Sequence, residues 1–205
     1  MDKIQIRIQP GSLIILAISF LLLPINWVLG WVLAAWVHEI GHLICIHYFR
    51  IPILSVSVGI QGAKIHSGPI PFPTNFLCTL AGPISGLMLL FGIRLIPEAA
   101  ICGLIQSSWN LIPMFSMDGS CAIKILLMKL FPQYVDKLHK GIENTTVLLI
   151  TIAVIYISIK LSVGILPFFI WILFLIRNKK EKLLRLAISK EFFILRKPRD
   201  SRVVL

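Results

Sequence analysis

Long apolar runs are the feature that most limits what this chain can fold into. Six segments, residues 12–24, 27–49, 75–96, 99–115, 145–159 and 162–176, carry almost no charged side chains. Charged residues make up only 14% of the 205 residues, and the mean hydropathy is +0.90. The apolar share is 57%, whereas a water-soluble domain has about 45–50%. The sequence therefore predicts a chain that lies in a lipid bilayer, with no stretch long enough for a separate soluble domain.

The six apolar segments predict an all-α polytopic membrane protein with about six transmembrane helices. Several segments are shorter than the roughly 20 residues that cross a bilayer upright, so thin or partly embedded spans are expected. The first segment follows Lys3 and Arg7, as in a secretory signal, but no small-x-small cleavage site precedes the next apolar run. We therefore interpret it as a span.

Lys and Arg residues predict the side of the membrane on which each end lies. The chain has 20 of them against nine Asp and Glu, a formal net charge of +11, and ten of the 20 follow Leu175. With six spans both ends share one side, and 18 of the 20 then fall on that side, Arg94 and Lys160 being the exceptions. Because positive loops stay in the cytosol, we expect cytosolic termini and a multi-pass protein of a bacterial cytoplasmic membrane. A basic tail beside apolar spans also argues against a nucleic-acid partner.

Residues 51–73 predict a membrane-associated β-hairpin between the second and third spans. Val56, Ser57 and Val58 alternate apolar and polar side chains, and three glycines and three prolines follow within fifteen residues. This composition is typical of strands and turns, here at about residues 53–58 and 63–66. An isolated hairpin is only marginally stable in water, so we expect it to lean on the helices or to enter the membrane surface.

The second apolar segment contains a metal-binding pattern, because residues 38–42 read His-Glu-Ile-Gly-His. Two histidines four residues apart on a helix point the same way and can bind one ion, with Glu39 beside them to hold or deprotonate a water. These three polar residues could instead pair with other buried groups and hold helices together. Ionisable residues at membrane depth cost several kcal/mol, however, and a divalent metal supplies a strong compensating interaction.

Asp118 is the acidic residue best placed to complete a metal site. Hydrolysis by zinc needs a third protein ligand and an open position. Asp118 follows the fourth apolar segment, with the helix breaker Pro113 before it and Gly119 after it. The second and fourth spans run in the same direction, so the histidine pair and Asp118 should reach the same cytosolic depth. The four cysteines stand singly in apolar runs, which favours neither a disulfide framework nor a thiolate site.

These two motifs carry a family resemblance. The His-Glu-x-x-His pattern in an early span, followed by Asn-Leu-Ile-Pro-Met-Phe-Ser-Met-Asp-Gly at residues 110–119, resembles the site-2 protease family of intramembrane zinc metalloproteases. Ala-Gly-Pro at residues 81–83 resembles a further signature of that family. The compact form resembles the branch with the stage IV sporulation protease, which cleaves a membrane-associated pro-sigma factor. The resemblance covers about residues 27–130, but Ser116 and Ser120 stand where the family commonly has Pro and a second Gly.

The resemblance implies a cofactor and a reaction. His38, His42 and Asp118 would bind zinc and Glu39 would act as the general base in hydrolysing peptide bonds in or next to transmembrane segments of membrane proteins. This implies a membrane-protein substrate, the lipid bilayer and an inhibitory membrane partner as partners, and regulated proteolysis that releases a membrane-bound transcription or sigma factor in sporulation. Residues 1–176 would form the intramembrane metalloprotease domain and residues 177–205 a basic cytosolic tail, without the nucleotide-sensing domain of longer members.

Three residues are candidates for substrate binding. Asn110 could donate a hydrogen bond to the substrate backbone or to the developing oxyanion, although an amide satisfied between helices is an equally simple interpretation. A helical substrate must unwind before its carbonyl can be attacked, and in a bilayer its freed backbone groups need new partners. Val56 and Val58 of the hairpin could provide such partners by adding the substrate as a strand, unless the segment is only a connecting loop.

Two other functions remain open. A zinc protease of the prenyl-protein processing type would use a downstream glutamate as third ligand, and Glu143 is the only plausible one. A non-proteolytic membrane protein that binds or transports metal would need the two histidines but would have no use for Glu39. Peptide-cleavage assays on an E39Q variant separate this function from proteolysis.

Overall fold

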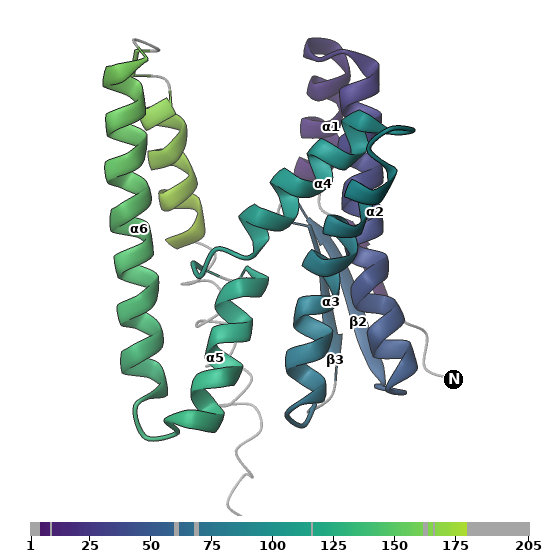
Figure 1. Ribbon diagram of the computed structural model, residues 1–205, viewed down its shortest axis with the longest axis vertical. Coiled ribbons are helices and arrows are strands. Elements are labelled where there is room, and N and C mark those ends of the chain that lie inside the picture. Colours follow the sequence, from purple (N-terminus) through teal and green to yellow (C-terminus); the bar gives the residue numbers. More distant parts are fainter. Residues whose placement is uncertain are drawn as a thin grey trace, which may run out of the picture. The chain divides into compact units, whose positions relative to one another are not determined.

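The computed structural model describes residues 5–8, 10–59, 62–67, 70–115, 117–161, 164–165 and 167–179 (Figure 1). The chain divides into two compact units, Met1–Thr146 and Val147–Leu205. The elements in chain order are β1 (Gln5–Ile8), α1 (Pro10–Leu22), α2 (Ile25–Tyr48), β2 (Ile53–Gly59), β3 (Gly62–Ser67), α3 (Thr74–Met88), η1 (Leu89–Gly92), α4 (Pro97–Asn110), α5 (Asp118–Leu130) and α6 (Val135–Lys160). Residues 167–179 are also helical. Most of the predicted basic tail lies outside the described residues.

Three helical stretches of the described chain are long and apolar enough to cross a membrane: Ile25–Tyr48, Thr74–Gly92 and Val135–Lys160. The other predicted spans correspond to shorter helices, with 13 residues in α1 and 14 in α4. At 1.5 Å per residue such helices are about 20 Å long, less than the roughly 30 Å of a hydrocarbon core. The prediction of a helical membrane protein is therefore supported, whereas the count of six spans is not established.

The boundaries of the second half of unit Met1–Thr146 differ from those predicted. The fourth apolar segment was expected to run to Phe115, but α4 ends at Asn110 because Pro113 cannot continue a helix. An unpredicted helix, α5, then begins at Asp118. The next helix, α6, begins at Val135, ten residues before the predicted start at Thr145, because its first turns are polar and invisible to a search for apolar runs.

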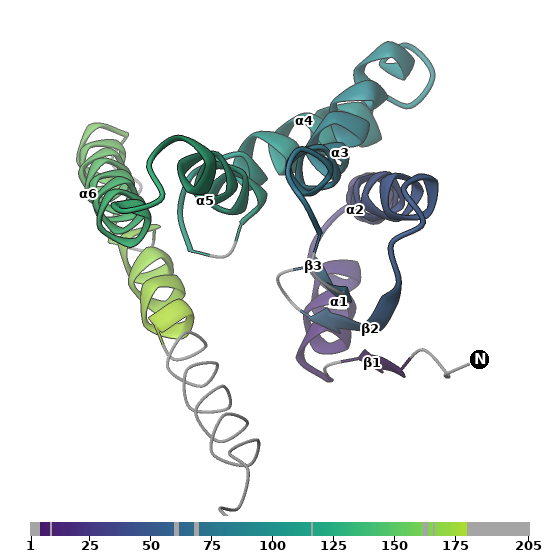
Figure 2. The same cartoon turned by 90° about the horizontal axis from the view of Figure 1, so that it is seen from below.

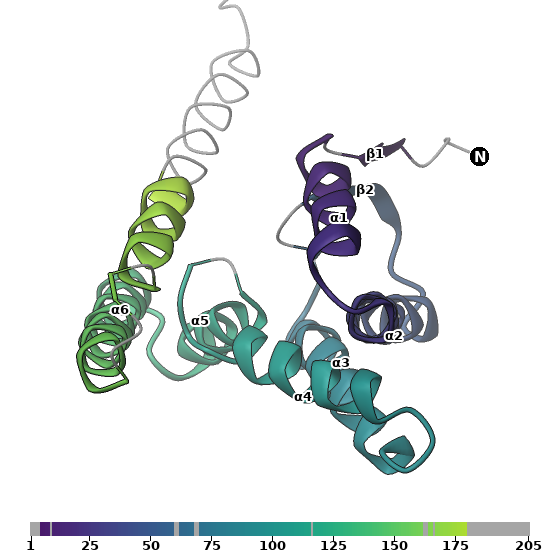
Figure 3. The same cartoon turned by 90° about the horizontal axis from the view of Figure 1, so that it is seen from above.

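A three-stranded sheet with the order β1-β2-β3 contains the predicted hairpin segment. β2 and β3 pair antiparallel, with Val56 opposite Ile65 and Val58 opposite Ala63. β1, which the sequence did not predict, pairs parallel with β2 on its other side. Figures 2 and 3 show β1 beside β2, with α1 following directly. β2 is therefore the central strand, and its backbone is paired along both sides.

Small residues let α2, α3 and α4 approach closely. A Cβ added at Gly41 of α2 would lie 2.6 Å from the carbonyl oxygen of Ala81 and would overlap Ser85, both on α3. A Cβ at Gly86 of α3 would overlap the hydroxyl of Ser107 on α4. In addition, the Ser85 hydroxyl lies 2.9 Å from the carbonyl oxygen of Val37 and donates to the α2 backbone. These contacts fix the helix that carries the histidine pair.

Large apolar side chains cover the outer surface of the helices. On α2 the exposed residues include Trp27, Trp31 and Trp36, and tryptophan is enriched where helices meet the membrane interface. Within unit Val147–Leu205, the indole nitrogen of Trp171 donates a hydrogen bond of 2.9 Å to the hydroxyl of Thr151 and ties α6 to helical residues 167–179. An apolar exterior of this extent is expected of a protein whose surroundings are lipid.

Candidate metal centre

The two histidines of α2 lie one turn apart and face the same point. Their Nε2 atoms are 3.3 Å apart, and the side chain of His38 is almost fully buried. Because α2 is an uninterrupted helix from Ile25 to Tyr48, the spacing of four residues brings both rings to one face. Two imidazole nitrogens in such a position can offer their lone pairs to one ion.

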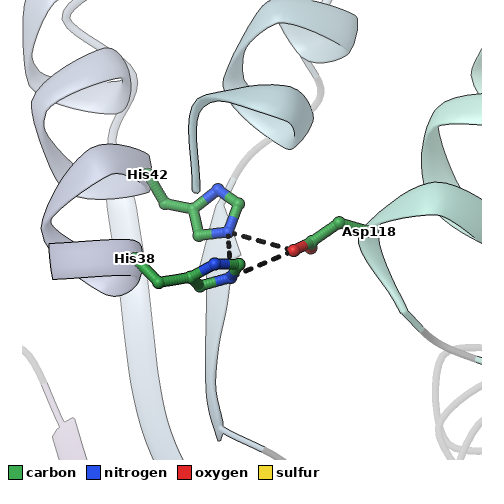
Figure 4. Close-up of side chains that lie close together, drawn as sticks. All are labelled: His38, His42 and Asp118. Atoms are coloured by element: carbon green, nitrogen blue, oxygen red, sulfur yellow. Dashed lines mark hydrogen bonds and ion pairs between the residues drawn. The ribbon is translucent and has the colours of Figure 1, made fainter. Parts of the chain in front are cut away.

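Asp118 completes the group from a different helix, since it is the first residue of α5. Its Oδ2 atom lies 3.1 Å from Nε2 of His38 and 3.5 Å from Nε2 of His42 (Figure 4). These three residues are the group of His, Cys, Asp and Glu side chains that could hold a metal ion in the described part of the chain. A meeting of Asp118 with the histidine pair was expected from the predicted depth of the two motifs.

The donor set fits a tetrahedral zinc ion. With metal–ligand bonds of about 2.0–2.1 Å, neighbouring ligand atoms around such an ion are about 3.3–3.4 Å apart. The three separations observed here are 3.1, 3.3 and 3.5 Å. Two imidazoles and one carboxylate leave the fourth position of a tetrahedron to water or substrate, as in catalytic zinc sites.

A backbone contact and a missing side chain orient the ring of His42. Its Nδ1 lies 2.8 Å from the carbonyl oxygen of Cys78, which can only accept, so Nδ1 carries the proton and the lone pair of Nε2 faces Asp118. Such a bond to the second nitrogen is typical of metal-binding histidines. A Cβ at Gly82 of α3 would overlap the His42 ring. The Ala-Gly-Pro signature therefore has a physical role here, because its glycine leaves room for the imidazole.

Asn110, the last residue of α4, lies beside the other histidine. Its Nδ2 is 3.3 Å from Nε2 of His38, the nitrogen whose lone pair would face a metal ion. The amide is thus at the edge of the candidate metal centre, where sequence analysis expected a substrate-binding role. The other nitrogen of His38, Nδ1, is buried and has no hydrogen-bond partner among the described residues.

The loop between α4 and α5 closes tightly behind Asp118. A Cβ at Gly119 would overlap the backbone carbonyl of Leu111, so the start of α5 packs directly on the end of α4. Met114 is fully buried in this loop, and Phe115 adopts the left-handed backbone conformation with φ of 54°. A non-glycine residue there is strained by about 1 kcal/mol or more, and such strain is common near functional sites. Ser116, one of the departures from the family pattern, lies outside the described residues.

The remaining predicted residues fall at different distances from the centre. Glu39 follows His38 on α2 and is close enough to His42 to interact with it electrostatically. Glu143, the alternative third ligand, is on α6 and is not part of the candidate metal group. Val56 and Val58 lie in the central strand of the sheet. Sequence reasoning missed the carbonyl of Cys78, because any residue supplies the same acceptor there.

Comparisons with known proteins relate the chain to a solved structure. No family profile matches the chain, and no curated protein matches its sequence. Among solved structures, the site-2 protease from Methanocaldococcus jannaschii superposes with a TM-score of 0.57 at 19% identity, covering 84% of this chain and 89% of that one. The chain therefore has the fold of a site-2 protease.

Proposed function

We propose that this chain is a zinc metalloendopeptidase of the site-2 protease type, which hydrolyses peptide bonds in or next to the transmembrane segments of other membrane proteins. One observation carries the proposal: two imidazole nitrogens and a carboxylate oxygen converge at 3.1–3.5 Å, the spacing that a tetrahedral zinc ion requires. The shared fold and the apolar helices support a site within the bilayer. His38, His42 and Asp118 would hold the metal, which when bound would polarise the scissile carbonyl and acidify a water.

The chain's own residues have distinct tasks in this proposal. Glu39 accepts the proton of the attacking water and passes it to the leaving amine, since a carboxylate next to the ligands can serve as base and then as acid. Asn110 presents amide hydrogens at the edge of the centre, where they can bond to the substrate backbone or the developing oxyanion. The Cys78 carbonyl holds His42 in the tautomer that keeps Nε2 available.

The proposal also gives the sheet a role, which is to present the substrate. We propose that an unwound segment of substrate pairs with an edge of the sheet and is held extended. Because Val56 and Val58 lie in the central strand, they support this edge through their pairing with β3, which is an edge strand of the described sheet. Proline at either position removes an amide donor and breaks strand geometry. V56P and V58P should bind zinc normally and cleave poorly, whereas V56A, which keeps the amide, should cleave well.

The E39Q variant tests the chemistry. Glutamine cannot accept the proton, so cleavage should fall by about 10²-fold or more, the usual contribution of a general base, while zinc content stays that of the wild type. E98Q is the matched control, because Glu98 lies in the first turn of α4 and outside the candidate metal group. If the E39Q variant cleaves as fast as the wild type, Glu39 is not the general base and the proposed mechanism is wrong.

The same pair of proteins identifies the substrate class. If wild type and E39Q are expressed in a bacterium, uncut membrane proteins with one span or a hairpin should accumulate only with E39Q. A membrane-tethered transcription or sigma factor among them would establish regulated release. If no membrane protein differs and wild-type protein moves zinc across vesicles, the chain is a metal transporter instead.

A further inference from the structure

A second histidine contact lies next to the candidate metal centre, on a helix that supplies no metal ligand. Nε2 of His139, in the second turn of α6, is 2.9 Å from the hydroxyl oxygen of Ser120 and 3.1 Å from the backbone carbonyl oxygen of the same residue. Ser120 is 1% exposed and lies two residues after Asp118 in the first turn of α5. The imidazole therefore holds both the side chain and the backbone of that turn.

The hydrogen-bond chemistry determines the direction of these contacts. A carbonyl oxygen only accepts, so Nε2 of His139 carries the proton that it shares between the carbonyl and hydroxyl oxygens of Ser120. A glycine at position 120 could offer only the carbonyl. Ser120, one of the departures from the family pattern noted in the sequence, thus adds a second anchor point for α6 on α5.

We propose that His139 is a positioning residue for Asp118, acting through Ser120. On one side, the start of α5 packs against the Leu111 backbone so closely that there is no space for a side chain at Gly119. On the other side, the His139 contact prevents the first turn from rotating or fraying. Asp118 is held between these two supports, and its carboxylate stays 3.1 Å and 3.5 Å from the two histidine nitrogens. This role rests on the proposed function, since it has His139 fix the position of Asp118, a proposed zinc ligand.

The test measures metal geometry with Co²⁺ as a spectroscopic substitute for zinc, together with the zinc dissociation rate. H139A should change the visible absorption of the Co²⁺-loaded protein and weaken zinc binding by about tenfold, the low end for residues that support metal ligands. H139Q should restore most of both values, because the glutamine amide nitrogen can take the place of Nε2. S120A removes the hydroxyl but keeps the carbonyl, so its effect should be smaller than that of H139A and should not add to it.

Two controls separate positioning from general packing. K124A removes a different side-chain contact between α5 and α6, the exposed pair of Lys124 and Asp136 at 3.8 Å, and should leave the Co²⁺ spectrum unchanged. H47A removes an exposed imidazole from the end of α2 and should also have no effect. If H139A and S120A both keep the wild-type spectrum and zinc dissociation rate, His139 does not position Asp118. K124A that matches H139A would overturn the proposal too.

Amide hydrogen exchange without metal gives a readout independent of the proposed function. The amides of residues 119–122 should exchange faster in H139A than in wild type or K124A. If D118A binds Co²⁺ as the wild type does, the proposed function fails, and exchange alone then decides whether His139 holds the turn. Unchanged exchange in H139A would overturn the proposal whatever the metal result.

Discussion

At the scale of single residues, the candidate centre depends on a missing side chain as well as on the side chains that form it. The proposed ligands are polar side chains, but the space for one of them comes from Gly82, whose missing side chain leaves room for the His42 ring. The carbonyl of Cys78 then selects the tautomer of that ring. Substitutions at Gly82 therefore test the site without replacing any of its three side chains.

We expect G82A to lose most of its zinc. The added methyl group would overlap the His42 imidazole, which would have to rotate away from Asp118 and release its bond to Cys78. Metal analysis of the purified protein should show well under one equivalent, with H38A and D118A as reference variants that lose the ion. Gly141 provides the control, since a Cβ there meets nothing within 4 Å. G141A should keep its zinc and gain about 0.5–1 kcal/mol of helix stability.

The three residues of the candidate centre could be singled out from the sequence, whereas the groups that support them could not. His38 and His42 were identified because helical spacing fixes how two side chains point, and Asp118 because few acids border an apolar segment. The acceptor at Cys78 is a backbone carbonyl oxygen, which every residue has, so the sequence cannot reveal it. The contact between His139 and Ser120 joins residues 19 positions apart on two helices, and no local pattern encodes it.

At the scale of elements, the apolar pattern identifies helices that face lipid but misses those that do not follow it. The long apolar helix α2 was predicted within two residues at either end. α5 contains two lysines and is only 13 residues long, so its apolar runs are too short to indicate a span. β1 has four residues and becomes a strand only because β2 offers a partner edge. Elements that depend on long-range pairing are the ones that local sequence cannot specify.

The packing of α3 on α4 predicts a rescue. G86A should destabilise the protein by about 1–3 kcal/mol, because the new methyl group overlaps the Ser107 hydroxyl. That hydroxyl is buried with no hydrogen-bond partner among the described residues, so S107A alone should be near neutral. In G86A/S107A the next contacts lie at 3.7 Å and stability should return. Unfolding in detergent, followed by circular dichroism, measures all three.

The corresponding pair on α2 and α3 should not show rescue. G41A overlaps Ser85, but its Cβ also lies 2.6 Å from the Ala81 carbonyl oxygen, which is backbone and cannot be trimmed. S85A would also remove the bond to the Val37 carbonyl. G41A/S85A should therefore be at least as unstable as G41A. Recovery of wild-type stability would mean that the two helices can separate without cost.

At the scale of the whole molecule, the charge distribution and the metal site make separate predictions. The basic residues predict that the C-terminus and the segment around Pro97 lie on opposite sides of the membrane. A reporter fused after Leu205 should be active as a cytosolic protein, and one inserted near Pro97 as an exported protein. A C-terminal fusion active only outside the cell would overturn the topology and the shared depth of the two ligand motifs.

Metal removal should lower the stability of the protein, because the proposed ligands join α2 to α5, with Asp118 lying 80 residues after His38 and 76 after His42. Free zinc at about 100 times its dissociation constant adds roughly 2.7 kcal/mol. Thermal unfolding of purified protein with and without a chelator should show this loss, and zinc should restore it. D118A should melt at the same temperature under both conditions. An equal effect of the chelator on D118A would place the stabilising ion elsewhere.

Because β1 pairs in parallel with β2, the first 59 residues begin and end in the same sheet. The chain leaves the sheet at Ile8, travels out through α1, returns through α2 and re-enters the sheet beside its starting strand. The return leg, α2, is about 36 Å long, whereas α1 alone is about 20 Å. β1 adds about 13 Å, which nearly closes the difference. Figure 1 shows α1 beside the first half of α2, and β2 and β3 beside its second half. β1 and α1 together therefore nearly match α2 in length, and the sheet lies beside the half of α2 that carries the histidine pair.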